Sequence, residues 1–247
     1  MKLIAPERLY EILNTDRLRY WEMLQLLKDR RDGQDALEAA FANDNDTCFS
    51  IVSHWHMGTD VFFSDYEPAF INEVLRRCPK AKRIFRFWFD LLPGQEAHFR
   101  HAHDDFYLSS SPYFAYTGEA PAASIDPHIH VLSGNEIDLL HPIIDLEHGY
   151  DVMHEPGIKA FAWFDEGQYK AYLACSPVYE EFWRIRYEYL KEQPLEVVTA
   201  LFYAYLKTIR ERSGIPITYD HLAASQKAGF QLYKTTHCFY GFKGTNY

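Results

Sequence analysis

The spacing of apolar residues predicts that helices and strands alternate in the first part of the chain. Within residues 1–40, apolar positions recur at three- and four-residue steps, as at Leu9, Ile12 and Leu13, which is typical of amphipathic helices. Residues 67–78 show the same helical spacing. Short aromatic and β-branched segments predict strands at 48–53, 60–64 and 83–90. This part is therefore expected to be α/β.

A small, Pro-containing segment at 118–124 is the best candidate for an interdomain linker. We therefore expect two domains, 1–123 and 124–247, in an α/β (α+β) fold. The pattern of the second predicts a strand at 127–132, a helix at 135–146, strands at 158–164, 169–176 and 182–190, a helix at 195–212, a strand at 215–218, a helix at 221–228 and a strand at 230–242. The long helix carries one apolar stripe, formed by Val198, Leu201, Phe202, Tyr205, Leu206 and Ile209.

Composition and charge exclude several classes of function. The 247 residues are 47% hydrophobic and 24% charged, which is typical of a globular protein and not of a disordered or fibrous one. No apolar run approaches the roughly 20 residues of a membrane helix. The net charge of −10 argues against nucleic-acid and anionic-membrane partners. Residues 181–247 differ, with nine Lys and Arg against six Asp and Glu, so a small anionic ligand is expected there.

Cysteine usage and the N-terminus indicate a cytoplasmic protein. Glu7 and Arg8 interrupt the stretch that a secretory signal would need to be apolar. The cysteines are scattered without a CxxC pair, which is typical of reduced thiols; they are Cys48, Cys78, Cys175 and Cys238. Aromatic residues reach 17%, which is compatible with a homodimer.

Three segments of the second half match the local patterns of one enzyme family. Residues 129–137 (IHVLSGNEI) are similar to an opening strand and its turn into a helix, 160–168 (AFAWFDEGQ) to the following hairpin, and 223–230 (AASQKAGF) to an A-L-x-x-K-x-G-F signature. Together they resemble the GNAT superfamily of acyl-CoA-dependent N-acetyltransferases. The resemblance implies a mixed central sheet flanked by helices, preceded by a smaller α/β N-terminal domain, with acetyl-CoA as co-substrate and an amine as acceptor.

The resemblance also implies where the cofactor and the catalytic groups lie. In that fold the central strand separates from its neighbour, and the next helix presents its N-terminal N–H groups to the CoA pyrophosphate. The implied cofactor-binding residues are Tyr189, Leu190, Lys191, Gln193, Glu196, Val197, Val198, Thr199, Thr218, Ser225 and Lys227. Glu188 is the candidate general base, and Tyr219 or Tyr233 the candidate acid.

The chain departs from the family pattern at the pyrophosphate loop, which reads Q/R-x-x-G-x-G/A and aligns with residues 193–198 (QPLEVV). Glu196 and Val198 replace small residues that let the backbone approach a phosphate, and a carboxylate repels it. Ser225 replaces the family's acidic Tyr. These departures favour a second hypothesis, a protein of the same fold that has an impaired cofactor site and acts as a binding or regulatory module.

Histidine spacing raises a third hypothesis, a metal-dependent hydrolase. Three HxH pairs occur, His54/His56, His101/His103 and His128/His130, and on a strand such residues share one face. The third pair lies in IDPHIHV, which resembles the first metal-binding strand of amidohydrolases. Only residues 131–247 follow it, whereas that barrel needs about 250 residues. We therefore rank this hypothesis last and predict no metal site.

Overall fold

The computed structural model describes residues 1–31, 36–55, 58–77, 84–93, 107–144, 153, 156–219 and 222–242. The chain divides into two compact units, Met1–Pro112 with Tyr233–Tyr247, and Tyr113–Leu232. These units do not coincide with the domains expected at 1–123 and 124–247. The end of the chain returns to the first unit because its last strand pairs with a strand of that unit.

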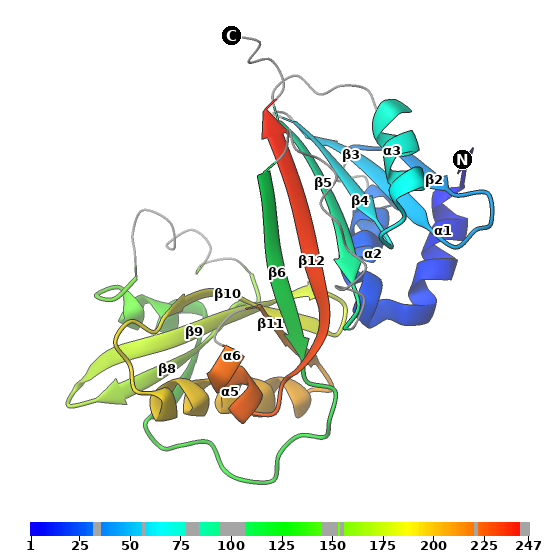
Figure 1. Cartoon of the computed structure of the whole chain (residues 1–247). Coiled ribbons are helices and arrows are strands. Elements are labelled where there is room, and N and C mark those ends of the chain that lie inside the picture. The colour runs from blue at the N-terminus through cyan, green and yellow to red at the C-terminus, as the bar shows by residue number, and fades with distance from the viewer. Residues whose placement is uncertain are drawn as a thin grey trace. The chain divides into compact units, whose positions relative to one another are not determined.

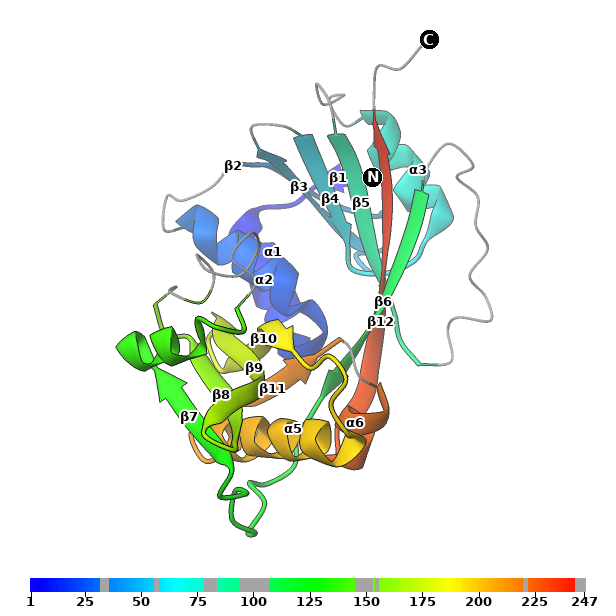
Figure 2. The same cartoon turned by 90° about the vertical axis from the view of Figure 1, so that its left-hand side faces the viewer.

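The N-terminal unit is a mixed sheet with helices on both faces (Figures 1 and 2). The sheet order is β1 (Lys2–Leu3), β2 (Ala36–Ala42), β3 (Phe49–Trp55), β4 (Gly58–Phe63), β5 (Ile84–Leu91), β12 (Gln231–Phe242) and β6 (Tyr107–Ala115). The helices are α1 (Pro6–Leu13), the 3-10 turn η1 (Asn14–Asp16), α2 (Arg17–Arg31) and α3 (Pro68–Arg77). Between α3 and the sheet lies an aromatic core that includes Phe63, Phe70, Phe87, Phe89 and Phe239.

Three strands of this unit were missed by the sequence patterns, the two-residue β1 and the longer β2 and β6. The strand β2 lies in a stretch that the spacing of apolar residues assigned to helix, and its sequence ALEAAFA favours helix locally. It is a strand because it pairs with β3 from Ala36 to Ala42. Strand β6 contains SSSP and gave no clear signal. The helix over 67–78 and the strands over 48–53, 60–64 and 83–90 match α3, β3, β4 and β5.

The C-terminal unit contains the strands and helices predicted from 127 to 228 in the predicted order, whereas the last predicted strand, β12, lies mostly in the N-terminal unit. The sheet runs from the end of β6 through β11 (Ile215–Thr218), β10 (Phe182–Tyr189), β9 (Gln168–Tyr179) and β8 (Lys159–Asp165) to β7 (Ile129–Ser133). Its helices are η3 (Gly134–Leu140), α5 (Leu195–Arg210) and α6 (Leu222–Lys227). The helix expected at 135–146 is a short 3-10 helix, opened by a capping box between Ser133 and Glu136.

The two faces of this sheet pack against different elements. The helix α5 covers one face with α6 beside it (Figure 2), and the core there, named the α5 core, includes Phe161, Leu173, Ile185, Leu201 and Tyr205. On the opposite face the η3 core includes Ile137, Leu140, Ala160, Tyr172 and Ala174. The central strands β8 and β9 therefore alternate between two apolar cores, as expected for a sheet covered on both sides.

The segment expected to be a linker is bonded to α5. The side chain of Tyr203 donates to Ala123 O (3.2 Å), and Lys207 Nζ donates to Pro121 O (2.6 Å). Arg210 Nε donates to Gly118 O (2.6 Å). The segment 118–124 therefore lies inside the C-terminal unit and not between the units.

None of the helices in the described ranges is long and apolar enough to span a bilayer.

Candidate functional site

The parallel strands β10 and β11 pair for only three residues. Phe182 to Arg184 pair with Ile215 to Ile217, and no further pair joins the two strands within the fully described stretch 156–219. Beyond Arg184, β10 continues to Tyr189 and pairs with β9 on its other side. An unpaired strand edge presents N–H and C=O groups to an extended partner. β11 therefore accompanies β10 only as far as Arg184, and within the fully described stretch 156–219 the part of β10 from Ile185 to Tyr189 has no pair on β11.

A β-bulge in β10 decides which way the next side chains point. The register against β9 shifts between Ile185 and Tyr187. Ile185 packs in the α5 core, but Tyr187 packs against the η3 core on the other face. Glu188 pairs with Leu173, whose side chain lies in the α5 core, so Glu188 also faces α5. Without the bulge, Glu188 would face the opposite side.

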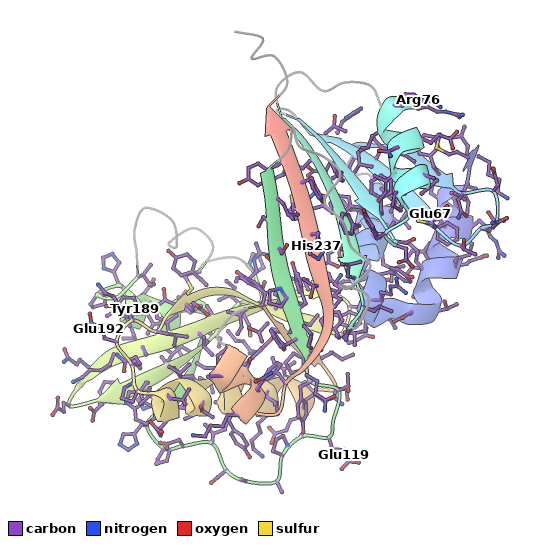
Figure 3. All side chains as sticks on the ribbon, in the orientation of Figure 1. Glu67, Arg76, Glu119, Tyr189, Glu192 and His237 are labelled. Carbon is purple, nitrogen blue, oxygen red and sulfur yellow. The ribbon has the colours of Figure 1, made fainter. Side chains whose placement is uncertain are left out.

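The loop after β10 leads directly into the N-terminus of α5. Gln193 N donates to Leu190 O (3.2 Å), which closes a turn in which Glu192 adopts a left-handed φ of 62°. Figure 3 shows Tyr189 and Glu192 at this end of β10. Pro194 is the N-cap residue, and no side chain caps the helix. The first turn of an α-helix leaves its N–H groups without intrahelical partners, and such groups at a helix N-terminus are able to bind an anion; in α5 they belong to Leu195–Val197.

The side chain of Gln193, which matches the first position of the family's loop, makes hydrogen bonds within the protein. Its Nε2 lies 3.3 Å from Lys170 O and 3.3 Å from Lys191 O. The side chain therefore ties the loop to β9. The Lys191 side chain is exposed, and Leu190 packs at the edge of the α5 core.

The two bulky replacements in the loop do not cover the helix N-terminus. Val198 is buried in the α5 core. The Glu196 side chain is 77% exposed, and its carboxylate lies 4.0 Å from Lys227 Nζ on α6. It caps none of the backbone N–H groups. Glu196 therefore opposes an anion through its charge rather than by filling the site, and Lys227 partly offsets that charge.

Replacing Glu196 with Gln is expected to tighten acetyl-CoA binding by about two- to fivefold, because exposed charges interact by less than about 1 kcal/mol in water. Isothermal titration calorimetry at low and high salt measures the change. Glu211→Gln at the other end of α5 is the matched control, and we expect no change there. An affinity that does not respond to Glu196→Gln would show that this carboxylate does not repel the ligand.

The remaining cofactor candidates differ in their accessibility. Thr218 and Ser225 are buried, Ser225 completely, so Ser225 cannot act as the acid in the family's position. The Thr199 hydroxyl donates to Leu195 O (2.7 Å) within α5. Tyr219 follows β11 and is 37% exposed, with its ring centroid 6.1 Å from that of Tyr113. Because β10 and β11 are parallel, Glu188 and Tyr219 both lie toward the carboxyl ends of these strands.

Tyr233, the other candidate acid, does not belong to this group. It lies in the N-terminal unit, where its phenol oxygen accepts a hydrogen bond from Trp21 Nε1 (3.1 Å). Burial raises the pKa of Tyr233 well above its usual value, so the phenol is a weaker acid than an exposed tyrosine. The sequence could not show this because Phe230–Phe242 reads as one continuous strand.

Tyr205 makes polar contacts that the sequence patterns did not predict. Its place in the apolar stripe of the long helix indicated packing alone. The buried hydroxyl in fact contacts backbone groups of both β10 and β11. A tyrosine at a position of the stripe otherwise filled by Leu, Phe and Ile predicts that Tyr205 is buried. It does not predict which groups the hydroxyl contacts.

The described histidines do not converge on one point. His128 Nδ1 lies 2.9 Å from Asp126 Oδ1, and its ring stacks on Trp163. His130 Nδ1 lies 3.0 Å from the Tyr169 hydroxyl. His56, His101 and His103 lie outside the described residues. Among the described residues no group of three His, Cys, Asp or Glu side chains has the arrangement of a metal site.

The comparison with known proteins gives matches in structure only. No family model and no curated protein sequence matches this chain. A GCN5-related N-acetyltransferase from Kribbella flavida is 11% identical, with 92% of this chain and 95% of that chain covered and a TM-score of 0.56. A GCN5-related N-acetyltransferase from Sphaerobacter thermophilus is 8% identical, with 98% and 94% covered and a TM-score of 0.53.

These likenesses show the fold. The predicted α/β architecture, a GNAT-like mixed sheet flanked by helices, is confirmed. The coverage spans nearly the whole of both chains, so the similarity is not limited to the segments at 129–137, 160–168 and 223–230. At 8 to 11% identity, the likeness carries no information on substrate.

Proposed function

We propose that this protein is an N-acyltransferase that moves an acetyl group from acetyl-CoA to an amine. The observation that carries the proposal is the short pairing of β10 and β11, which ends at Arg184 while β10 continues along β9 to Tyr189. From there β10 leads through a short loop to the uncapped N-terminus of α5. With its pantetheine arm extended along β10, acetyl-CoA would bring its diphosphate toward the α5 amides, where the helix dipole favours negative charge.

The proposed chemistry is direct transfer from the thioester to the amine. The amine nitrogen attacks the thioester carbonyl carbon, the new C–N bond forms, and the C–S bond breaks. We assign to Glu188 the role of the base that takes the proton of the amine, because it is the carboxylate on the part of β10 that extends beyond the pairs with β11 and it faces α5. Tyr219, exposed beyond the end of β11, is the proposed acid that protonates the leaving thiolate.

Binding of acetyl-CoA is expected to stabilise the protein against unfolding. A ligand at 100 times its dissociation constant adds about 2.7 kcal/mol, which a thermal-shift assay detects as a higher Tm. Acetyl-pantetheine, which lacks the diphosphate, is the matched probe and is expected to bind at least about tenfold more weakly, since it loses the charge-assisted contacts at the helix N-terminus. The absence of any shift at millimolar acetyl-CoA would exclude the proposed cofactor.

A second candidate function is a binding or regulatory module that retains the site without catalysis. The observation that favours it is the complete burial of Ser225, which leaves no acid at the family's position. A panel of amines with radiolabelled acetyl-CoA separates the two functions. Transfer to any amine supports the enzyme, and acetyl-CoA binding without transfer supports the module.

The proposed location is the cytoplasm. Cys48, Cys175 and Cys238 are free and buried, which is compatible with a reducing compartment. A homodimer stays a prediction.

A further inference from the structure

The two units repeat one order of strands and helices. In the N-terminal unit β1 precedes α1 and α2, the antiparallel strands β2, β3 and β4 follow, and α3 connects β4 to the parallel strand β5. In the C-terminal unit β7 precedes η3, the antiparallel strands β8, β9 and β10 follow, and α5 connects β10 to the parallel strand β11. The first strand of each unit is antiparallel to the second, β1 to β2 and β7 to β8. The two units therefore share one order and one set of strand directions.

The sixth strand of each sheet comes from the other half of the chain. β6 follows β5 in the sequence, but its end pairs antiparallel with β11 through Phe114 and Ala115. β12 follows β11 in the sequence, but it pairs antiparallel with β5 from Thr235 to Phe242. The strand orders are β1-β2-β3-β4-β5-β12 and β7-β8-β9-β10-β11-β6, which is one order with the two sixth strands swapped.

We propose that the chain contains two copies of one fold with swapped sixth strands, and that acetyl-CoA binds to the second copy alone. The first copy is the N-terminal unit, and the second copy is the C-terminal unit. Six strands in the same order, with the same directions and with a helix before the same parallel strand, indicate a duplication. The location of acetyl-CoA rests on the proposed function, whereas the repeat and the strand swap do not.

In the first copy the two parallel strands pair along the whole of β4. Gly58–Phe63 pairs with Ile84–Phe89 in one continuous register, whereas the pairs of β10 with β11 end at Arg184. Across the first pair of strands, the Arg86 guanidinium donates two hydrogen bonds to the Asp60 carboxylate (2.6 and 2.7 Å). The side of β4 that faces β5 is therefore used by the sheet, and it offers no edge to an extended ligand.

The helix that follows β4 has carboxylates at its N-terminus. Asp65 and Glu67 directly precede α3, and Figure 3 shows Glu67 at one end of this helix and Arg76 at the other. Arg19 pairs with Asp65 (2.8 Å), but Glu67 accepts a hydrogen bond from the uncharged amide of Asn43 (2.7 Å). Carboxylates at a helix N-terminus interact favourably with the helix dipole and repel an anion. The first copy therefore disfavours a diphosphate at α3.

The charges at the start of α5 are balanced. The loop before this helix contains Lys191 and Glu192, and Glu196 in the first turn lies 4.0 Å from Lys227. Two acidic side chains are thus matched by two basic ones, and no side chain caps the helix. A diphosphate meets no net negative charge there, so we expect one acetyl-CoA per chain, at the second copy.

Isothermal titration calorimetry and amide hydrogen exchange locate acetyl-CoA on the full chain. We expect one ligand per chain, with exchange slowed about tenfold or more at 189–198 and unchanged at 63–70 when the ligand is at 100 times its dissociation constant. Lys227→Gln is expected to weaken binding by about two- to fivefold, and Glu67→Gln is the control without effect. Two ligands per chain, or slower exchange at 63–70, would overturn the inference.

A second measurement tests the strand swap without any ligand. β6 and β12 each begin in one unit and end in the other, so opening one copy also disrupts a strand of the other. Phe87→Ala removes a completely buried ring of the first copy that stacks on Phe239 of β12 (4.7 Å). We expect the slowest amides of both α3 and α5 to exchange about 100-fold faster, the effect of losing a core phenylalanine on global unfolding.

Leu3→Ala is the control for this measurement, because it shortens an exposed side chain of the same unit, and it is expected to exchange like the wild type. Faster exchange in α3 with unchanged exchange in α5 would show that the copies are stable independently, which contradicts the strand swap. If Phe87→Ala does not fold, Phe87→Leu is the second variant, with exchange about fivefold faster in both helices. If the wild type does not bind acetyl-CoA, the proposed function fails together with the location of the ligand, whereas the responses of α3 and α5 still decide the strand swap.

Discussion

Replacing Lys234 with Met is expected to lower the free energy of unfolding by about 3–5 kcal/mol, the usual cost of removing one partner of a buried ion pair. Lys234 on β12 has a completely buried side chain. Its ammonium group lies 2.5 Å from Glu22 Oε2 on α2, 2.8 Å from Asp90 Oδ2 on β5, and 3.1 Å from Arg19 O. Removing the charge would leave two largely buried carboxylates facing each other. Denaturant unfolding measures the loss.

The contribution of Lys234 to the free energy of unfolding is expected to decrease only at high pH. Burial opposes the ammonium charge, but attraction from Asp90 and Glu22 raises its pKa well above its usual value. A raised pKa means that the stabilisation is complete below the unfolded value of about 10.4 and is lost as pH rises through the folded value. The difference in stability between wild type and Lys234→Met is therefore expected to be the same at pH 7 and pH 9.

Two variants control for the change of side chain. Lys170→Met removes a partly exposed lysine that pairs with the exposed Glu166, and its stability is expected to stay within error of the wild type. The triple variant Glu22→Gln, Asp90→Asn, Lys234→Met removes all three charges together and is expected to recover most of the loss, because no buried charge is left unpaired. A Lys234→Met protein as stable as the wild type would contradict the assignment of this cluster.

Replacing Glu188 with Gln is expected to lower kcat for acetyl transfer by about 10²–10⁴-fold, the usual contribution of a general base. Glutamine keeps the size and the hydrogen-bonding capacity of the side chain but cannot take a proton. Steady-state rates with a reactive amine and saturating acetyl-CoA measure the change. The dissociation constant for acetyl-CoA is expected to stay the same, since the carboxylate acts on the amine.

Glu192→Gln is the matched control for this substitution. It removes a carboxylate from the loop that directly follows β10, where the side chain is exposed, and kcat is expected to be unchanged. A drop in kcat for Glu192→Gln as large as that for Glu188→Gln would point to a general effect of charge near the site. A Glu188→Gln enzyme with full kcat would remove Glu188 from the mechanism.

Local sequence patterns were sufficient for most elements of the C-terminal unit. The strand at 215–218 coincides with β11, and the strand at 182–190 agrees with β10 to within one residue. The long helix begins at Leu195 as predicted. Each of these elements has a continuous apolar pattern and a clear turn at its end, so neighbouring residues alone carry enough information. β2 is the counterexample, because its alanine-rich sequence becomes a strand only by pairing with β3.

No local pattern encodes the contacts of the Tyr205 hydroxyl, because this side chain of α5 reaches backbone groups on two strands that are distant in sequence. The face of Glu188 is likewise not a sequence property, because the bulge after Ile185 inverts the alternation.

The sequence by itself therefore determined the order and the type of the elements in the second half, together with the charge and the small number of candidate residues around 188–198. Only the tertiary structure decided which of those residues meet. In the structure, Tyr233 lies in the N-terminal unit, and the carboxylate of Glu196 lies near Lys227. The hydroxyl of Tyr205 contacts the backbone of β11. The physical reason is that apolar periodicity reports burial, whereas a hydrogen bond or an ion pair depends on which distant segment of chain lies opposite.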